Sequence, residues 1–311
     1  MSSAAARTSR RGFVRQNARF REWVTADGSS GYAAEPGRYH LYVSHACPWA
    51  HRTLVVRALK GLEDAIGVSI VDPIRDERGW AFRDVPGATD DALHGWSYLS
   101  EAYVATQPGY DGRISVPVLW DTRTDRIVNN ESADIILMLN EAFDAFAAHP
   151  EVDLYPAELR DEIDELNRHV YETVNNGVYR AGFAGSQEAY DEAVYPLFET
   201  LDALDERLGS QRFLFGARHT LADWRLFTTL VRFDPVYVGH FKCNLRRIAD
   251  YAHLPAYLRD LYQTPGIAQT VDMDHIKRHY YATHPDINPT CIVPAGPIVD
   301  LDAPHGREAL G

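Results

Sequence analysis

The pattern of apolar and polar positions divides the chain into a first part with strand-like runs and a second part with helical periodicity. Residues 39–44 form a short aromatic and β-branched run, which is typical of a strand. Pro48 follows at a position that favours the start of a helix, and apolar residues recur beyond it at helical spacing. Residues 67–73 are a second strand-like run. The pattern therefore predicts strand, helix and strand in that order.

Residues 113–130 predict a β-hairpin, because two apolar runs flank the turn residues T-R-T-D. Pro117 cannot donate a ladder hydrogen bond, so it belongs at the start of a strand. An edge-strand proline is one interpretation; in a thioredoxin-type sheet a proline here is typically cis, and the element order favours that. A helix is predicted at positions 135–143, with Ser132 as its N-cap and with backbone N–H groups that suit a carboxylate. Residues 72–108, rich in turn residues, predict a long ordered loop without a regular element.

The second part of the chain predicts helices. Two of them have recognisable ends: residues 187–208 lie between Ser186 as cap and Gly209 as stop, and a helix from Thr220 to Arg232 opens with a capping box that uses Asp223. Further helices are expected at residues 157–179, 254–271 and 273–281. The predicted organisation is an arm at 1–36, an α/β thioredoxin-like domain at 37–148, an all-α domain at 156–285 and a tail at 286–311.

Composition narrows the functional classes. The 311 residues carry a formal net charge of −13, which disfavours nucleic acid and anionic membranes as partners. The N-terminal S-R-R-G-F-V resembles a twin-arginine export signal, but the polar residues that follow exclude the apolar run such a signal needs. Three cysteines are too few for a disulfide scaffold and indicate a reducing compartment. A cytoplasmic protein is expected.

Cys47 is the strongest candidate for chemistry. It is predicted at the turn before the first helix, where unpaired backbone N–H groups and the helix dipole stabilise a thiolate. The sequence C-P-W-A has Ala50 where a resolving cysteine would stand, so the partner thiol must come from solution. A buried, inert cysteine is the alternative, and that is how we interpret Cys243 and Cys291.

The histidines offer weaker signals. His275 and His279 are four residues apart, a spacing that suits a metal, but no third ligand is evident and no metal is expected. His45 and His51 flank Cys47; they can tune a thiol, although solvated or core histidines are the more common case.

Several motifs resemble one family from about Phe13 to Pro297. They are C-P-W-A-H-R, R-D-E-R-G-W-A-F, G-R-I-S-V-P-V-L-W-D, N-N-E-S, N-N-G-V-Y-R-A-G-F-A, A-D-W-R-L-F-T-T-L-V-R-F-D-P-V-Y and I-N-P-T. The chain resembles the glutathionyl-hydroquinone reductases, the Xi class of cysteine-type glutathione transferases. The resemblance implies a glutathione transferase fold, a homodimer, no bound cofactor, and glutathione as cosubstrate. Another small thiol such as γ-glutamylcysteine remains an alternative.

The resemblance also implies roles for single residues. Cys47 matches the nucleophile, Tyr179 the proton donor, and Tyr237 and Tyr280 the lining of the quinone pocket. The glutathione moiety is expected at Trp80, Arg113, Ile114, Val116, Pro117, Glu131 and Ser132. The implied activity removes glutathione from a glutathionyl-hydroquinone through a mixed disulfide with Cys47. Two alternatives stay open: an omega-like thioltransferase or dehydroascorbate reductase, and a non-catalytic binding module of the same fold.

Overall fold

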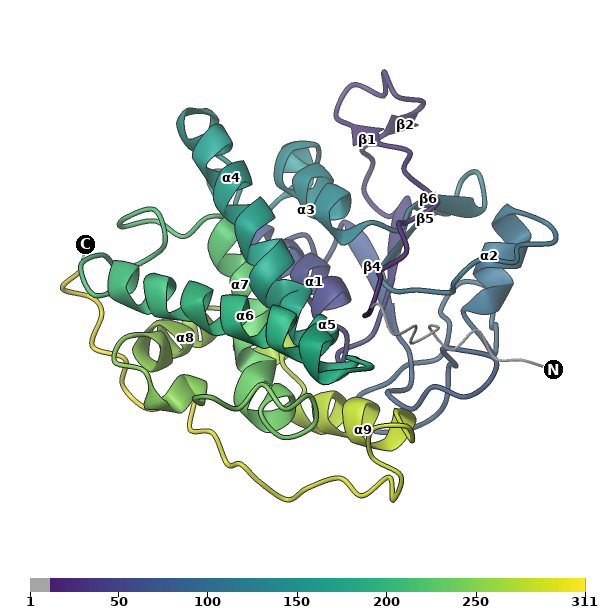
Figure 1. Ribbon diagram of the computed structural model, residues 1–311. Coiled ribbons are helices and arrows are strands. Elements are labelled where there is room, and N and C mark those ends of the chain that lie inside the picture. Colours follow the sequence, from purple (N-terminus) through teal and green to yellow (C-terminus); the bar gives the residue numbers. More distant parts are fainter. Residues whose placement is uncertain (1–11, 311) are drawn as a thin grey trace. The chain divides into compact units, whose positions relative to one another are not determined.

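The computed structural model describes residues 12–310 (Figure 1). These residues form two compact units. The sheet unit comprises Gln16–Asp153 and Gln269–His279. The helical unit comprises the described residues up to Arg15, Leu154–Ala268, and the described chain from Tyr280 onward. The expected arm is thus divided between the two units, and its residues 1–11 lie outside the described part.

The sheet unit is built on four strands: β3 (Tyr39–Val43), β4 (Ile66–Ile70), β5 (Val118–Asp121) and β6 (Arg126–Asn129). Their order is β4-β3-β5-β6; β3 pairs with β4 in parallel and with β5 antiparallel, and β5 pairs antiparallel with β6. Consequently the carboxyl ends of β3, β4 and β6 and the start of β5 share one edge of the sheet. The predicted strands and hairpin are confirmed.

Two helices of this unit, α1 (Pro48–Lys60) and α3 (Ser132–Glu141), pack against each other. Their inward positions, such as Val55 and Ile135, are fully buried, which explains the apolar periodicity of both segments. A small parallel pair, β1 (Val24–Thr25) and β2 (Tyr32–Ala33), precedes the sheet.

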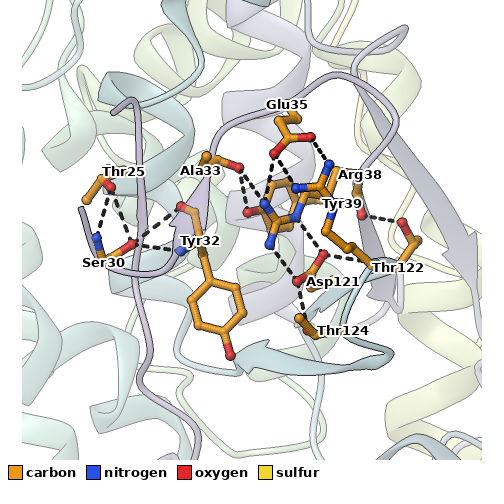
Figure 2. A network of polar contacts seen from close by, with 11 residues as sticks. Thr25, Ser30, Tyr32, Ala33, Glu35, Arg38, Tyr39, Asp121, Thr122 and Thr124 are labelled. Atoms are coloured by element: carbon orange, nitrogen blue, oxygen red, sulfur yellow. Dashed lines mark hydrogen bonds and ion pairs between the residues drawn. The ribbon is translucent and has the colours of Figure 1, made fainter. Parts of the chain in front are cut away.

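A buried ion pair fastens the chain before β3 to the end of β5. Arg38 donates two hydrogen bonds of 2.8 Å to the carboxylate of Asp121, and Thr124 donates a third of 2.7 Å (Figure 2). Burial raises the pKa of Asp121, but the hydrogen bonds from Arg38 and Thr124 outweigh it, so the pKa lies below its usual value. Glu35 extends the network to Arg38 and Arg123.

A buried carboxylate holds part of the long segment after β4. Asp91 accepts hydrogen bonds from the hydroxyl of Tyr42 at 2.9 Å and from the backbone N–H groups of His94 and Trp96, each at 3.0 Å. The segment also contains the helix α2 (Ser100–Thr106), so the expectation of no regular element was wrong. A helix of seven residues is too short to produce a recognisable apolar period.

The helical unit contains α4 (Arg160–Val170), α5 (Gly177–Gly182), α6 (Gln187–Leu208), α7 (Leu221–Arg232) and α8 (Leu254–Gln263). α9 (Met273–Thr283) begins in the sheet unit and ends in the helical unit. Short helical turns are η1 (Asp144–Phe146), η2 (Ala157–Leu159), η5 (Ile248–Asp250) and η6 (Ala268–Thr270), and η3 (Tyr171–Asn175) and η4 (Phe233–Tyr237) are π-helical.

The caps of α6 and α7 are confirmed. Ser186 accepts a hydrogen bond from the N–H of Ala189, and Thr220 and Asp223 form the predicted capping box. The prediction of a single helix at 157–179 was wrong, because the π turn η3 separates α4 from α5. The helix expected at 254–271 stops at Gln263, since Pro265 cannot continue it.

The C-terminal tail is held on the helical unit by its side chains. Arg307 is buried and donates hydrogen bonds to the carbonyl oxygens of Leu208, the last residue of α6, and of Gln211 and Arg212 just beyond it. Gln263 donates to the carbonyl oxygen of Leu301 at 2.8 Å. Within residues 12–310, the structure has no helix with the length and apolar character needed to cross a membrane.

Candidate active site

Cys47 lies between β3 and α1 and is the N-cap residue of α1. Its backbone carbonyl accepts the N–H of His51 at 2.9 Å, but its side chain makes no capping hydrogen bond. The thiol is half-buried, and its sulfur lies 3.7 Å from the carbonyl oxygen of Val116. The first turn of α1 carries no acidic residue. The positive end of the helix therefore faces the sulfur without a competing negative charge from that turn.

The segment opposite Cys47 leads into β5. The Val116–Pro117 peptide bond is cis, as predicted. Val116 is buried, Ile114 is half-buried and Arg113 is exposed. The hydroxyl of Tyr103 donates a 2.7 Å hydrogen bond to the carbonyl oxygen of Ser115, and this bond fixes the backbone directly before Val116.

The start of α3 differs from the prediction in one respect. Glu131, and not Ser132, is the N-cap: its carboxylate accepts the N–H of Ala133 at 3.1 Å. Ser132 is the first residue of the helix, so its side chain is one position too late to cap. Its hydroxyl is buried and has no hydrogen-bond partner among the described residues. A buried polar atom that lacks a partner is costly, so this hydroxyl is a candidate group for binding a ligand.

Trp80 lies in the segment after β4. Its side chain is 4% exposed and its ring stacks on His279, with the ring centroids 4.9 Å apart. The guanidinium carbon of Arg75 lies 5.2 Å from the same ring. Trp80 therefore anchors the segment, and contact with a ligand would involve only the small exposed part of its side chain.

The three predicted tyrosines meet in the helical unit. The hydroxyl of Tyr280 lies 2.5 Å from that of Tyr179 and 3.1 Å from that of Tyr237. Tyr237 and Tyr280 are fully buried, whereas Tyr179 is half-buried. Burial raises the pKa of Tyr237 and of Tyr280 well above the usual range, the neighbouring Tyr179 raises both further, and Arg232 opposes the rise. These phenols remain protonated at neutral pH.

Other aromatic groups enclose Tyr179. Phe13 and Phe183 stack on its ring, and the guanidinium carbon of Arg15 lies 4.6 Å from the ring centroid. Gly182 permits the close approach of Phe241, because a Cβ at this glycine would lie 2.2 Å from the phenyl ring. The sequence motifs identified Tyr179, but not the contact with Arg15, which depends on the path of the N-terminal segment.

The histidines and remaining cysteines have other surroundings. His275 lies 2.7 Å from the carbonyl oxygen of Pro86, and His279 lies 2.7 Å from that of Pro73. No group of three or more metal-ligating side chains occurs among residues 12–310. Cys243 is buried, which raises the pKa of its thiol, and Cys291 is exposed.

Comparisons with known proteins match this architecture. The family model described as "Glutathione S-transferase, N-terminal domain" matches residues 46–142, and the corresponding C-terminal domain model matches residues 187–260. The chain is 57% identical to glutathionyl-hydroquinone reductase YqjG of Escherichia coli over 95% of this chain and 92% of that protein. It is 53% identical to glutathionyl-hydroquinone reductase PcpF of Sphingobium chlorophenolicum over 93% of this chain and 91% of that protein.

Comparison with solved structures supports the same family. The Xi class glutathione transferase from Natrialba magadii superposes with a TM-score of 0.93 at 56% identity, covering 96% of this chain and 93% of that chain. The chain belongs to the Xi class of glutathione transferases. The glutathione-bound structure of YqjG from Escherichia coli superposes with a TM-score of 0.91 at 57% identity, covering 93% of this chain and 96% of that chain. The expected fold, a thioredoxin-like α/β part followed by a helical part, is confirmed.

Arg75 was not singled out by the sequence, although it stands five residues before Trp80 in the motif R-D-E-R-G-W. It makes no hydrogen bond or ion pair with any residue that the structure describes. Burial lowers its pKa, the charge of Arg113 lowers it further, and Cys47 acts in the opposite sense. Arg75 is thus a half-buried charge near the thiol.

Proposed function

We propose that the chain is a thiol-dependent reductase that removes glutathione from glutathionyl-hydroquinones. The observation that carries this proposal is Cys47: a half-buried thiol at a helix N-terminus, with Ala50 at the position of a resolving cysteine. High identity to proteins named glutathionyl-hydroquinone reductases supports the choice of substrate. No bound cofactor is needed, because glutathione supplies the electrons.

We place the glutathione moiety along the edge of the sheet that carries Cys47. The backbone of Val116 would pair with the cysteinyl residue, with Pro117, Ile114 and Arg113 beside it. Glu131 and Ser132 would hold the γ-glutamyl end. The unpaired hydroxyl of Ser132 and the N-terminus of α3 support an anionic group at this point.

The first chemical step breaks the bond between sulfur and the hydroquinone ring. The Cys47 thiolate attacks the thioether sulfur and forms a disulfide with the glutathionyl group, while the electron pair of the broken bond goes to the ring carbon. That carbon takes a proton, for which we propose Tyr179 as general acid. The hydrogen-bonded hydroxyls of Tyr280 and Tyr237 support this role, because they stabilise charge on Tyr179 after proton transfer.

The second step returns the thiol. A second glutathione, as thiolate, attacks the mixed disulfide, releases oxidised glutathione and leaves Cys47 as thiolate. The proton lost by this glutathione restores Tyr179. The balance is therefore one glutathionyl-hydroquinone and one glutathione consumed, one hydroquinone and one oxidised glutathione formed.

An omega-like thioltransferase is the second candidate. A relative named "Glutathione S-transferase omega-like 2", from Schizosaccharomyces pombe, is 48% identical to this chain. The tyrosine cluster favours the quinone reaction, because reduction of a mixed disulfide requires no proton transfer to carbon. A non-catalytic binding module would have no need for a thiol at this position.

The decisive experiment measures reductive turnover of glutathionyl-menadione with excess glutathione or γ-glutamylcysteine. We expect turnover by the wild type, none by Cys47→Ala, and wild-type rates for Cys291→Ala, whose thiol is exposed and distant in sequence from the proposed site. When the wild type is incubated with glutathionyl-menadione and no free thiol is added, mass spectrometry should show one glutathionyl group on Cys47. A Cys47 adduct without turnover would favour the thioltransferase, and absence of both would leave the binding module.

We also propose a cytoplasmic homodimer that associates through the helical domain, as the resemblance to the family implies. Three free cysteines support a reducing location. Sedimentation velocity of the full chain tests the oligomeric state, with a single species of about twice the 35.1 kDa monomer mass as the expected result.

A further inference from the structure

The edge of the sheet presents its candidate binding groups in a fixed order. Arg75 follows β4, Cys47 follows β3, Val116 precedes β5, and Glu131 with Ser132 follow β6. Since the sheet order is β4-β3-β5-β6, the segments that carry Arg75 and Ser132 follow the two outer strands, and those that carry Cys47 and Val116 adjoin the two inner strands. Neighbouring strands are about 4.8 Å apart, so the row spans about 14 Å.

An extended γ-linked tripeptide matches this row. Three extended residues span about 10 Å, and the γ-linkage adds further backbone atoms. With the sulfur at Cys47 and the γ-glutamyl end at Ser132, the other end of the tripeptide must run toward the exit of β4. That end carries the glycyl carboxylate.

Arg75 is a charge that lacks a protein partner. Its Nε is buried without a hydrogen bond, and no carboxylate among residues 12–310 forms an ion pair with it. Its guanidinium carbon lies 5.2 Å from the centroid of the Trp80 ring, a cation–π contact that holds the group in place. By contrast Arg78, three residues later, is exposed and pairs with Asp76. A planar guanidinium held in this way suits a carboxylate, which accepts two hydrogen bonds from it.

We infer that Arg75 binds the carboxylate at the C-terminal end of the thiol cosubstrate and so selects a tripeptide thiol over a dipeptide thiol. The inference rests on the proposed function, because it places the cosubstrate by its sulfur at Cys47. In γ-glutamylcysteine the terminal carboxylate belongs to the cysteinyl residue, one residue short of Arg75. Glutathione is then the preferred cosubstrate, and Arg75 is the origin of the preference.

The test is a binding cycle that needs no turnover. Calorimetry on the reduced full chain gives the Kd for glutathione, for its glycyl monoethyl ester and for γ-glutamylcysteine, in the wild type, in Arg75→Gln and in the matched control Arg78→Gln. For the wild type we expect glutathione to bind about tenfold more tightly than the other two thiols. This is the contribution expected from one charge-assisted hydrogen bond, here between Arg75 and the glycyl carboxylate. In Arg75→Gln this preference should disappear through loss of glutathione affinity alone, and in Arg78→Gln it should persist.

Two results would overturn the inference. One is an unchanged preference in Arg75→Gln; the other is an equal loss for all three thiols, which would mean that Arg75 acts on Cys47 or on the fold. Arg75→Lys, which keeps the charge but loses the planar fork, should recover part of the preference, and thermal unfolding confirms that each variant is folded. Failure of the proposed function is separate: it appears as absent turnover with glutathionyl-menadione, whatever the binding cycle gives.

Discussion

The hydroxyl of Tyr179 lies 2.5 Å from the hydroxyl of Tyr280, and Tyr280 is itself within 3.1 Å of Tyr237. Only the outermost of the three phenols, Tyr179, is half-exposed; the other two are buried and remain protonated. If Tyr179 gives up its proton, the resulting phenolate can accept a hydrogen bond from the hydroxyl of Tyr280. This relationship is the basis for the different roles that we propose for the three tyrosines.

Tyr179→Phe should lower kcat for glutathionyl-menadione about a hundredfold, because the ring carbon loses its general acid. The same variant should reduce a simple glutathione mixed disulfide at the wild-type rate, since that reaction protonates no carbon. The ratio of the two activities in steady-state kinetics is the measurement. Tyr195→Phe, at an exposed tyrosine of α6, is the control, and an equal loss of both activities in Tyr179→Phe would contradict the assignment.

Ser132→Ala should weaken glutathione binding about tenfold, through loss of a hydrogen bond to a charged group. The free enzyme should be at least as stable as the wild type, because the substitution removes a buried hydroxyl that lacks a partner. Calorimetric binding and thermal unfolding of the same samples test both parts. The exposed Ser29→Ala should change neither quantity, and a destabilised Ser132→Ala would show that the hydroxyl already has a structural partner.

Asp121→Asn should lower the free energy of unfolding by about 3 kcal/mol at neutral pH, because the buried Arg38 loses its bidentate, fully buried carboxylate and keeps only the more exposed Glu35. The pKa of Asp121 is lowered in the folded protein. Its contribution is therefore complete above the unfolded value of about 4 and declines as the pH falls through the folded value. Denaturant unfolding at several pH values should show wild type and variant converging in acid.

Asp111→Asn is the control for that comparison. Asp111 is exposed and pairs with the exposed Arg19, so its loss should cost less than about 0.5 kcal/mol at any pH. A constant difference between the wild type and Asp121→Asn down to the most acidic pH would contradict the charge-based explanation.

Arg307→Ala should destabilise the helical unit by about 2 kcal/mol, because buried carbonyl oxygens after α6 lose their charged donor. Arg307→Lys should recover little, since one ammonium group cannot reproduce the several hydrogen bonds of the guanidinium. Thermal unfolding monitored by calorimetry gives the comparison. The exposed Arg218→Ala should leave the midpoint unchanged.

Local rules of the sequence were sufficient where a feature depends on neighbours in the chain. The capping box of Thr220 and Asp223, the hairpin turn after β5 and the position of Cys47 before Pro48 are set within a few residues, and the structure confirms each. The same rules erred in two helices. The π turn of η3 interrupts the helix expected at 157–179, and the N-cap of α3 is Glu131, one residue before the predicted Ser132.

The tertiary structure alone decided which chemistry-bearing side chains lack a partner. The sequence singled out Ser132 but not Arg75, and it does not show that either side chain lacks a partner, because any serine or arginine can find a hydrogen bond in solvent or in a neighbour. Only the folded sheet unit encloses them without one. Likewise, the sequence places Tyr179 and Tyr280 about a hundred residues apart, and it is the packing of the helical unit that joins their hydroxyls. The sequence determined most of the elements and identified Cys47 as the candidate nucleophile, whereas long-range packing determined which side chains lack a hydrogen-bond partner.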